Sequence, residues 1–130
     1  MKYISRINGS VVKAKGNDDF SVQDMVYVGT IRLVGEVISV DGDEATVQVY
    51  ESTSGLKPGE PVETTGEPLS VYLAPGIIGN MFDGIQRPLE KLYETSGDFI
   101  TRGQQMENLD TQKKWHFIPV LQEGAQVGAL

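Results

Sequence analysis

The chain contains one imidazole, His116, which is the only side chain of its type able to act as a general base or a metal ligand. A general base needs a nucleophile and an orienting acid beside it, and no motif around His116 supplies either. The chain has no cysteine, which excludes thiolate metal sites, thiol nucleophiles and disulfides. We therefore interpret His116 as a half-buried strand histidine, and the adjacent Trp115 as a core or interface anchor.

The glycine-rich stretch 76–84 (GIIGNMFDG) raises the question of phosphate binding. A P-loop requires GxxxxGK[ST], in which the lysine reaches the phosphates and the hydroxyl group holds magnesium. No lysine of this chain is followed by serine or threonine, and the GxGxxG spacing of a dinucleotide site is absent too. We interpret the stretch as a tight apolar turn.

Two further local patterns resemble functional motifs but are incomplete. The acidic residues Asp41, Asp43 and Glu44 lie in a turn far shorter than the twelve-residue calcium loop of an EF-hand. Ser10 follows Gly9, but the next residues do not complete a nucleophile elbow. We therefore expect a hairpin turn at the acidic residues, and no catalytic, cofactor-binding or metal site in this chain.

The composition is that of one soluble globular domain. The chain has 130 residues, 39% of them hydrophobic and 22% charged, which is ordinary for a folded protein. Its net charge of −7 argues against binding to nucleic acid or to an anionic lipid surface. The N-terminus has no apolar signal region and no segment reaches the length of a spanning helix, so we expect a soluble protein that is not exported.

The first 75 residues are expected to form an all-β unit, because short strand patterns alternate with turn residues. The clearest hairpin joins the run 31–40, through the turn Asp41–Glu44, to residues 45–50, in which Ala45, Val47 and Val49 share one face. Short strands with a single buried face close stably into a small antiparallel β-barrel. The expected strands are Tyr3–Ile7, Ser10–Lys15, Val22–Val28, Ile31–Val40, Ala45–Tyr50, Pro61–Thr65 and Leu69–Leu73.

The second half of the chain has a different character. Residues 76–94 are expected to form a packed connector with a short helix at Pro88–Tyr93, where proline is tolerated at the first helical position. Residues 95–130 are polar at first, and Trp115–Leu121 is expected to form a strand interrupted by Pro119. The glycine-rich ending, 123–130, predicts a hairpin turn without its return strand, so we expect the chain to stop inside a domain.

Four stretches of the chain are distinctive in sequence. They are RINGSVVKAKG at 6–16, VQVYESTSGLKPGEPVETTGEPLSVYLAPGIIGNMFDGIQRPL at 47–89, SGDFITRG at 96–103 and KKWHFIPV at 113–120. Together they resemble the start of the catalytic A subunit of V/A-type rotary ATPases, and the stretch 47–89 is the most specific of them. Tyr72 and Ala74 depart from that family's pattern, in which an acidic residue and a glycine are expected at these positions.

The resemblance implies a division of the chain and a place in an assembly. Residues 1–75 would form an N-terminal β-barrel that joins the barrels of neighbouring A and B subunits in a hexameric ring. Residues 76–94 would be a connector, and 95–130 would begin an inserted β-rich domain similar to a barrel-sandwich hybrid. The parent subunit would use Mg-ATP, with its nucleotide-binding motifs outside this segment, and would couple ATP synthesis or hydrolysis to H⁺ or Na⁺ transport. It would be cytoplasmic and peripheral to the membrane, through the assembled complex.

Two other functions fit parts of the sequence. An autonomous acidic β-barrel that binds another protein, without catalysis, fits the composition and the strand pattern. The ending also resembles the first half of a lipoyl-type carrier hairpin, but no modifiable lysine lies in a turn there.

Overall fold

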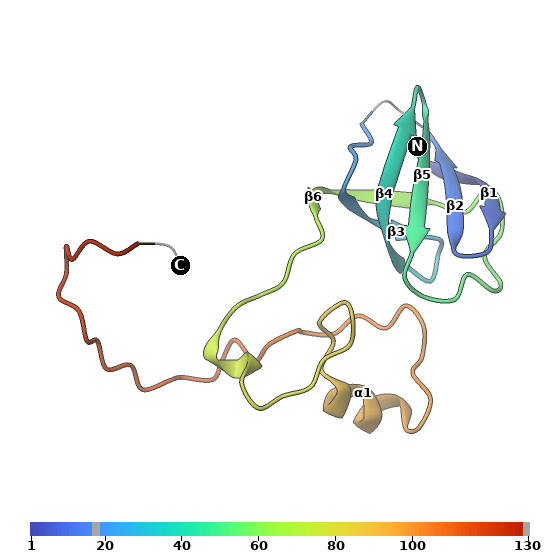
Figure 1. The fold of residues 1–130 in the computed structure, drawn as a ribbon. Coiled ribbons are helices and arrows are strands. Elements are labelled where there is room, and N and C mark those ends of the chain that lie inside the picture. Colours follow the sequence, from blue (N-terminus) through green and yellow to red (C-terminus); the bar gives the residue numbers. More distant parts are fainter. Residues whose placement is uncertain (17–18, 129–130) are drawn as a thin grey trace.

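The N-terminal half of the protein is a six-stranded antiparallel sheet, which confirms the expected β class (Figure 1). The computed structural model describes residues 1–16 and 19–128. The strand order across the sheet is β1-β2-β5-β4-β3-β6. The strands are β1 (Tyr3–Asn8), β2 (Val11–Lys15), β3 (Asp24–Val28), β4 (Leu33–Asp41), β5 (Glu44–Val49) and β6 (Val62–Pro68).

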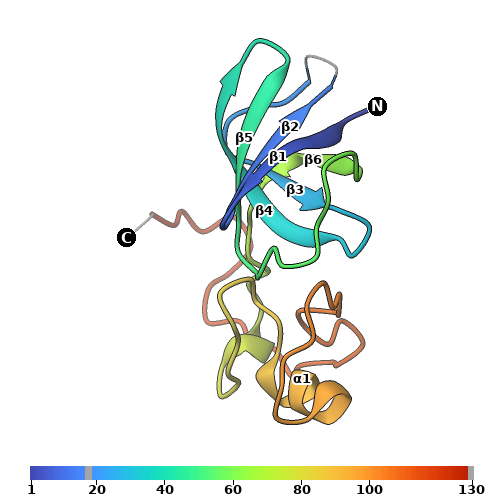
Figure 2. The same cartoon turned by 90° about the vertical axis from the view of Figure 1, so that its right-hand side faces the viewer.

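The sheet curls until its two edge strands, β1 and β6, lie beside each other (Figure 2). They are joined by an isolated bridge between Tyr3 and Pro61 rather than by a ladder. The amide of Ile4 donates to the carbonyl of Glu60 over 2.8 Å, and the amide of Val62 donates to the carbonyl of Lys2 over 3.0 Å. The expected closed barrel is therefore a barrel whose last seam is short, and the sheet ladder itself stays open there.

The hairpin expected around the acidic turn is present. Asp41 pairs with Glu44, so that β4 and β5 are connected by two residues, and Gly42 adopts a left-handed φ of 60°. This conformation is nearly free of cost for glycine and explains why that residue type occupies the turn. The predicted turn at Asp41–Glu44 is confirmed.

The barrel interior is filled by small and branched apolar side chains from all six strands. Alternate residues of each strand face inwards because successive side chains of a strand point to opposite faces. Two residues outside the strands, Phe20 and Leu56, complete the cluster. The strand residues buried in it are Ile4, Val12, Ala14, Val26, Val28, Leu33, Val37, Ala45, Val47, Val49 and Val62.

The strand expected at Leu69–Leu73 does not form. Strand β6 ends at Pro68, which pairs with Asp24, the first residue of β3, so no partner residues remain for a longer ladder. Val71 and Leu73 are exposed instead of sharing a buried face. The side chains of this segment alternate as those of a strand do, but alternation alone does not supply a neighbouring strand.

The connector leaves β6 and folds into a smaller body below the barrel (Figure 1). It contains a 3₁₀ turn, η1 (Pro75–Ile77), and one helix, α1 (Leu89–Ser96), among the described residues. The helix begins at Leu89, one residue later than expected, so Pro88 occupies the N-cap position instead of the first helical position. Gly97 ends the helix with a φ of 68°. No helix within the described residues combines the length and the apolar character needed to cross a bilayer.

The strand expected at Trp115–Leu121 is also absent. Residues 111–128 form no helix or strand and are exposed throughout (Figure 1). A strand needs a neighbouring strand to pair with its backbone groups, and alternating side chains alone do not provide that neighbour.

Glu60, next to the seam of the barrel, makes the stability of the fold sensitive to acid. Its carboxylate accepts hydrogen bonds from the amides of Thr30 and Lys57, both over 2.9 Å. The bond from Thr30 contributes most to the lowered pKa of Glu60. Because its folded-state pKa is depressed, the carboxylate stabilises the barrel above the ordinary value and loses this effect as the pH falls through the folded-state pKa.

We therefore expect Glu60→Gln to be less stable than the wild type near neutral pH, and the difference to shrink as the pH falls below the ordinary pKa of a glutamate and through the lowered pKa of Glu60. Urea unfolding at several pH values measures it. Glu94→Gln, on exposed α1, removes the same charge and should leave the pH dependence of the wild type unchanged. An equal acid response in the wild type and Glu60→Gln would contradict the assignment.

Candidate functional site

Among the residues that the structure describes, Arg87 has the most heavily buried charged side chain, and it lies in the junction between the barrel and the connector. Arg87 is 8% exposed and forms ion pairs with Glu51 of the barrel (2.9 Å) and Asp83 of the connector (2.7 Å). A further donor of the same guanidinium reaches the backbone carbonyl of Gln104 over 3.3 Å. One cation therefore joins three parts of the chain that are distant in sequence.

Local turn chemistry holds Arg87 in this position. Oδ1 of Asp83 accepts hydrogen bonds from the amides of Ile85 and Arg87, over 3.1 and 2.8 Å. An aspartate that accepts from the backbone two and four residues ahead stabilises a compact turn. The turn places the guanidinium of Arg87 beside the second carboxylate oxygen of Asp83.

At the same junction, the side chain of Gln86 binds the backbone of Tyr72 as a neighbouring strand would. Its side-chain amide accepts from the amide of Tyr72 and donates to the carbonyl of Tyr72, both over 2.7 Å. Gln86 has a positive φ of 62° and is buried. The segment that leaves β6 is thus tied to the connector by one side chain instead of a ladder.

The charges of the junction favour the ionised state of Arg87. Burial alone would lower the pKa of Arg87, but the hydrogen bond with Asp83 and the negative charges of Glu51 and Asp83 outweigh it and raise that pKa. The guanidinium stays charged under all ordinary conditions. It acts as a fixed structural cation, and no proton transfer through it is expected.

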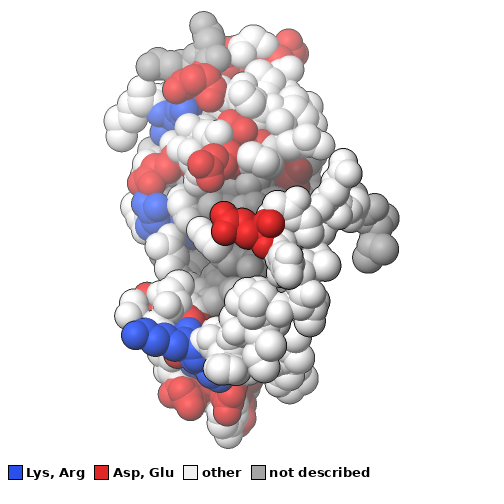
Figure 3. Space-filling view, turned by 90° about the vertical axis from the view of Figure 1, so that its left-hand side faces the viewer, with Lys and Arg blue, Asp and Glu red and all other residues white. Residues whose placement is uncertain are grey.

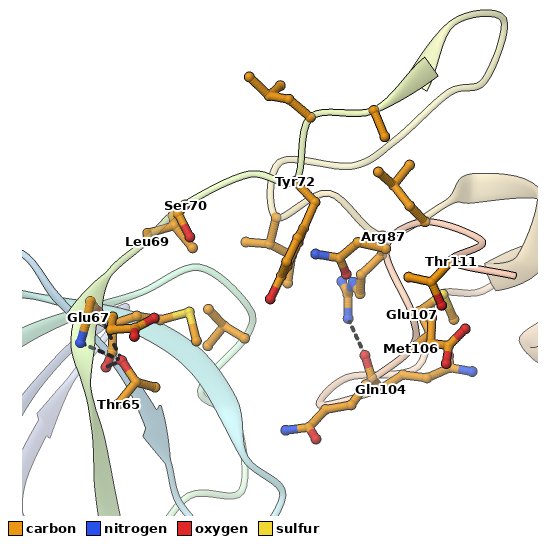
Figure 4. Close-up of a pocket in the computed structure, with 18 of the residues that line it drawn as sticks. Thr65, Glu67, Leu69, Ser70, Tyr72, Arg87, Gln104, Met106, Glu107 and Thr111 are labelled. Carbon is orange, nitrogen blue, oxygen red and sulfur yellow. Dashed lines mark hydrogen bonds between the residues drawn. The ribbon is translucent and has the colours of Figure 1, made fainter. Parts of the chain in front are cut away.

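A cavity of about 710 Å³ lies between the barrel and the connector, beside Arg87 (Figure 4). Barrel residues Met25, Tyr27 and Val34 line one side, and Tyr72 and Ile85 line the connector side. The wall is mostly apolar, and the positive charge of Arg87 is already compensated by two carboxylates. The arrangement suits packing between segments better than chemistry on a substrate.

The residues that the sequence singled out for possible chemistry, His116 and Trp115, do not lie at this junction. His116 is exposed, which corrects the expectation of a half-buried strand histidine. Trp115 is 46% exposed with Lys113 over its ring at 4.5 Å, so it is not a core residue. Within the described residues, no three histidine, aspartate or glutamate side chains are placed to share a metal ion.

The glycine-rich stretch 76–84 is less buried than the sequence predicts. Ile78 and Met81 are exposed, so the expected apolar turn is only partly packed.

Glu44 of the acidic turn accepts a hydrogen bond from Lys13, which is the main reason why the pKa of Glu44 is lowered. Ser10 lies in the turn between β1 and β2 and accepts through its carbonyl from Val49. These are structural roles.

Acidic side chains predominate over basic ones on the face shown in Figure 3, in agreement with the net charge of −7. Lysine and arginine side chains are separated from one another on this face. A site for a polyanion requires them to be gathered.

The junction between the barrel and the connector is not visible in the amino-acid sequence. Glu51 and Arg87 are 36 positions apart, and no local pattern connects them. The one available signal was the Asp83-Gly84 pair, because Asp-Gly marks a turn.

The comparisons with known proteins agree with this architecture. The model of the ATP synthase alpha/beta family, beta-barrel domain, matches residues 4–66. Among solved structures, the assembled ATPase EscN of the enteropathogenic E. coli type III secretion system is similar with a TM-score of 0.61 and 25% identity. That similarity covers 68% of this chain and 21% of EscN.

The sequence relatives are more similar and extend further along the chain. The V-type ATP synthase alpha chain of Clostridium novyi is 49% identical over 126 residues, and that of Clostridium botulinum is 52% identical. The alpha chain of Streptococcus gordonii is 52% identical over 127 residues. In each case the match covers 97% of this chain and 21% of the relative, so the chain spans about a fifth of their length. The chain belongs to the ATP synthase alpha/beta family through its β-barrel, and it is similar over nearly its whole length to the N-terminal region of V-type ATP synthase alpha chains.

Proposed function

We propose that this chain is the N-terminal assembly region of the catalytic alpha (A) subunit of a V-type ATP synthase. The observation that carries the proposal is the identity of about half of all residues to such alpha chains across 97% of the chain. The parent would couple ATP synthesis or hydrolysis to the transport of H⁺ or Na⁺. It would lie in the cytoplasm, at the membrane surface, through the assembled complex.

In this proposal the barrel serves assembly. Neighbouring A and B subunits would form a hexameric ring, with the barrels side by side at one end. The barrel suits such a role because its core lies within residues 4–62 and needs no side chain from the connector. Residues 1–75 would be the barrel unit, 76–94 the connector, and 95–130 the start of the inserted domain.

A graft tests this role directly. The matching first fifth of the Clostridium novyi alpha chain is replaced by this chain, and ring assembly and ATPase activity are measured after reconstitution. We expect both to be retained. The corresponding graft from Streptococcus gordonii, with similar identity to this chain, controls for damage at the fusion point. A working Streptococcus graft beside a failed graft of this chain would contradict the proposal.

The proposal places Mg-ATP outside this segment. We expect calorimetric titration of the isolated chain with Mg-ATP to show no saturable heat of binding. The chain has no lysine followed by serine or threonine, which a P-loop uses to hold phosphates and magnesium. The reconstituted complex is the positive control. Saturable binding of one nucleotide per isolated chain would contradict this part of the proposal.

A further inference from the structure

Residues 102–104, Arg-Gly-Gln, return from the connector to the end of the barrel; we name them the strap. The amide of Gly103 donates to the carboxylate of Glu51 over 3.2 Å. The guanidinium of Arg102 donates to the backbone carbonyls of Ser52 (3.0 Å) and Ser54. Each of these contacts joins the strap to the loop that follows β5.

The loop offers the strap hydrogen-bond acceptors. The carboxylate of Glu51 and the carbonyls of Ser52 and Ser54 all accept, whereas the strap donates through an amide and a guanidinium. Hydrogen bonds that include a charged donor or acceptor are about twice as strong as neutral ones. An Arg-Gly dipeptide therefore complements this surface in both charge and hydrogen-bonding character.

Gly103 fits its place for a steric reason as well. Its φ is 66°, a conformation that other residues rarely adopt. A Cβ added there would lie 1.9 Å from the carbonyl oxygen of Ile31 and 3.1 Å from its carbon. The obstacle is barrel backbone, which cannot turn aside as a flexible side chain does. Any residue except glycine would push the strap off the barrel.

We propose that the strap is an intramolecular latch, and that the acceptor surface formed by Glu51, Ser52 and Ser54 with the carbonyl of Ile31 is its docking site. The latch is coupled to the connector because Glu51 binds both the strap and Arg87. Release of the strap removes one of the two groups that hold Glu51 in place, and residues 83–104 then loosen together. The latch thereby sets how the connector sits against the barrel, independently of the proposed role in an ATP synthase.

Hydrogen exchange on the 130-residue chain tests the latch. In Gly103→Ala we expect exchange of segments 83–88 and 99–105 to rise roughly ten- to hundredfold, because strain and overlap act on the docked state alone. Strands β4 and β5 should keep their wild-type protection. Gly79→Ala is the matched control: φ there is 80°, but nothing lies within 4 Å of the added Cβ. It carries similar backbone strain without the overlap, so it should raise exchange in the same two segments by less than Gly103→Ala does.

A second variant removes the donors without changing the backbone requirement. Arg102→Gln loses the guanidinium that binds Ser52 and Ser54, and we expect a smaller increase in exchange, in the same two segments. Equal exchange in Gly103→Ala and Gly79→Ala would overturn the proposal. So would faster exchange confined to 99–105, because the coupling through Glu51 would then be absent. If Gly103→Ala unfolds the barrel, Arg102→Gln alone decides, and unchanged exchange there rejects the latch.

Discussion

Replacing Arg87 by methionine is expected to open the junction between the barrel and the connector while the barrel stays folded. The side chain of Arg87 is 8% exposed, and its partners Glu51 and Asp83 are 10% and 16% exposed. Methionine would leave two nearly buried carboxylates without their common cation. Breaking a buried ion pair by removing one partner costs about 3–5 kcal/mol. This loss of free energy destabilises the folded arrangement of residues 83–104, and it is large enough to unfold that segment locally.

Two measurements separate local from global effects. Hydrogen exchange of residues 83–104 should approach the rate of an open chain, whereas the midpoint of barrel unfolding should change little, because the barrel core contains no connector residue. Arg87→Lys keeps the charge but loses the planar fork that binds two carboxylates, so we expect an intermediate effect.

Arg32→Met is the matched control for the loss of an arginine. Arg32 pairs with Glu63, but both side chains are more than 40% exposed, and exposed ion pairs contribute about 0–1 kcal/mol. Arg32 also lies 4.3 Å from the ring centre of Tyr27, which adds a similarly small contribution. Equal effects of Arg32→Met and Arg87→Met would show that the junction is not held by its buried charges.

The barrel was largely predictable because its information is local. The hairpin at Asp41–Glu44 combines a turn residue with alternating strands on both sides, and every part of that pattern is satisfied by neighbours in sequence. The buried positions Ala45, Val47 and Val49 followed from the same alternation. A period of two assigns the face of a strand directly, without knowledge of the rest of the fold.

The remaining errors share one physical cause. The segments Leu69–Leu73 and Trp115–Leu121 have the composition of strands, but a strand exists through its ladder partner, and the described residues provide none. The junction escaped prediction for a related reason. Glu51, Arg87 and Gly103 are brought together by tertiary folding, and an exposed charge and a buried charge look alike in sequence.

Within the barrel, Leu33→Ala is expected to lower the free energy of unfolding by about 2–5 kcal/mol. Leu33, in β4, is 0% exposed and lies in the central cluster, where alanine would leave a cavity and remove dispersion contacts. Domains of this kind are stable by only about 5–15 kcal/mol, so a large share of the stability would be lost. Urea unfolding followed by circular dichroism should show a lower midpoint with an unchanged slope.

Leu73→Ala deletes the same atoms from a side chain that is 78% exposed, on the segment that leaves β6. Because these atoms are already in contact with water, their removal should change the free energy of unfolding by no more than about 0.5 kcal/mol. The comparison isolates burial from side-chain chemistry, since both variants make the same substitution. A loss at Leu73 as large as that at Leu33 would mean that the segment beyond β6 packs onto the barrel in solution. A loss below about 1 kcal/mol at Leu33 would mean that the core relaxes into the space, which close-packed interiors rarely do.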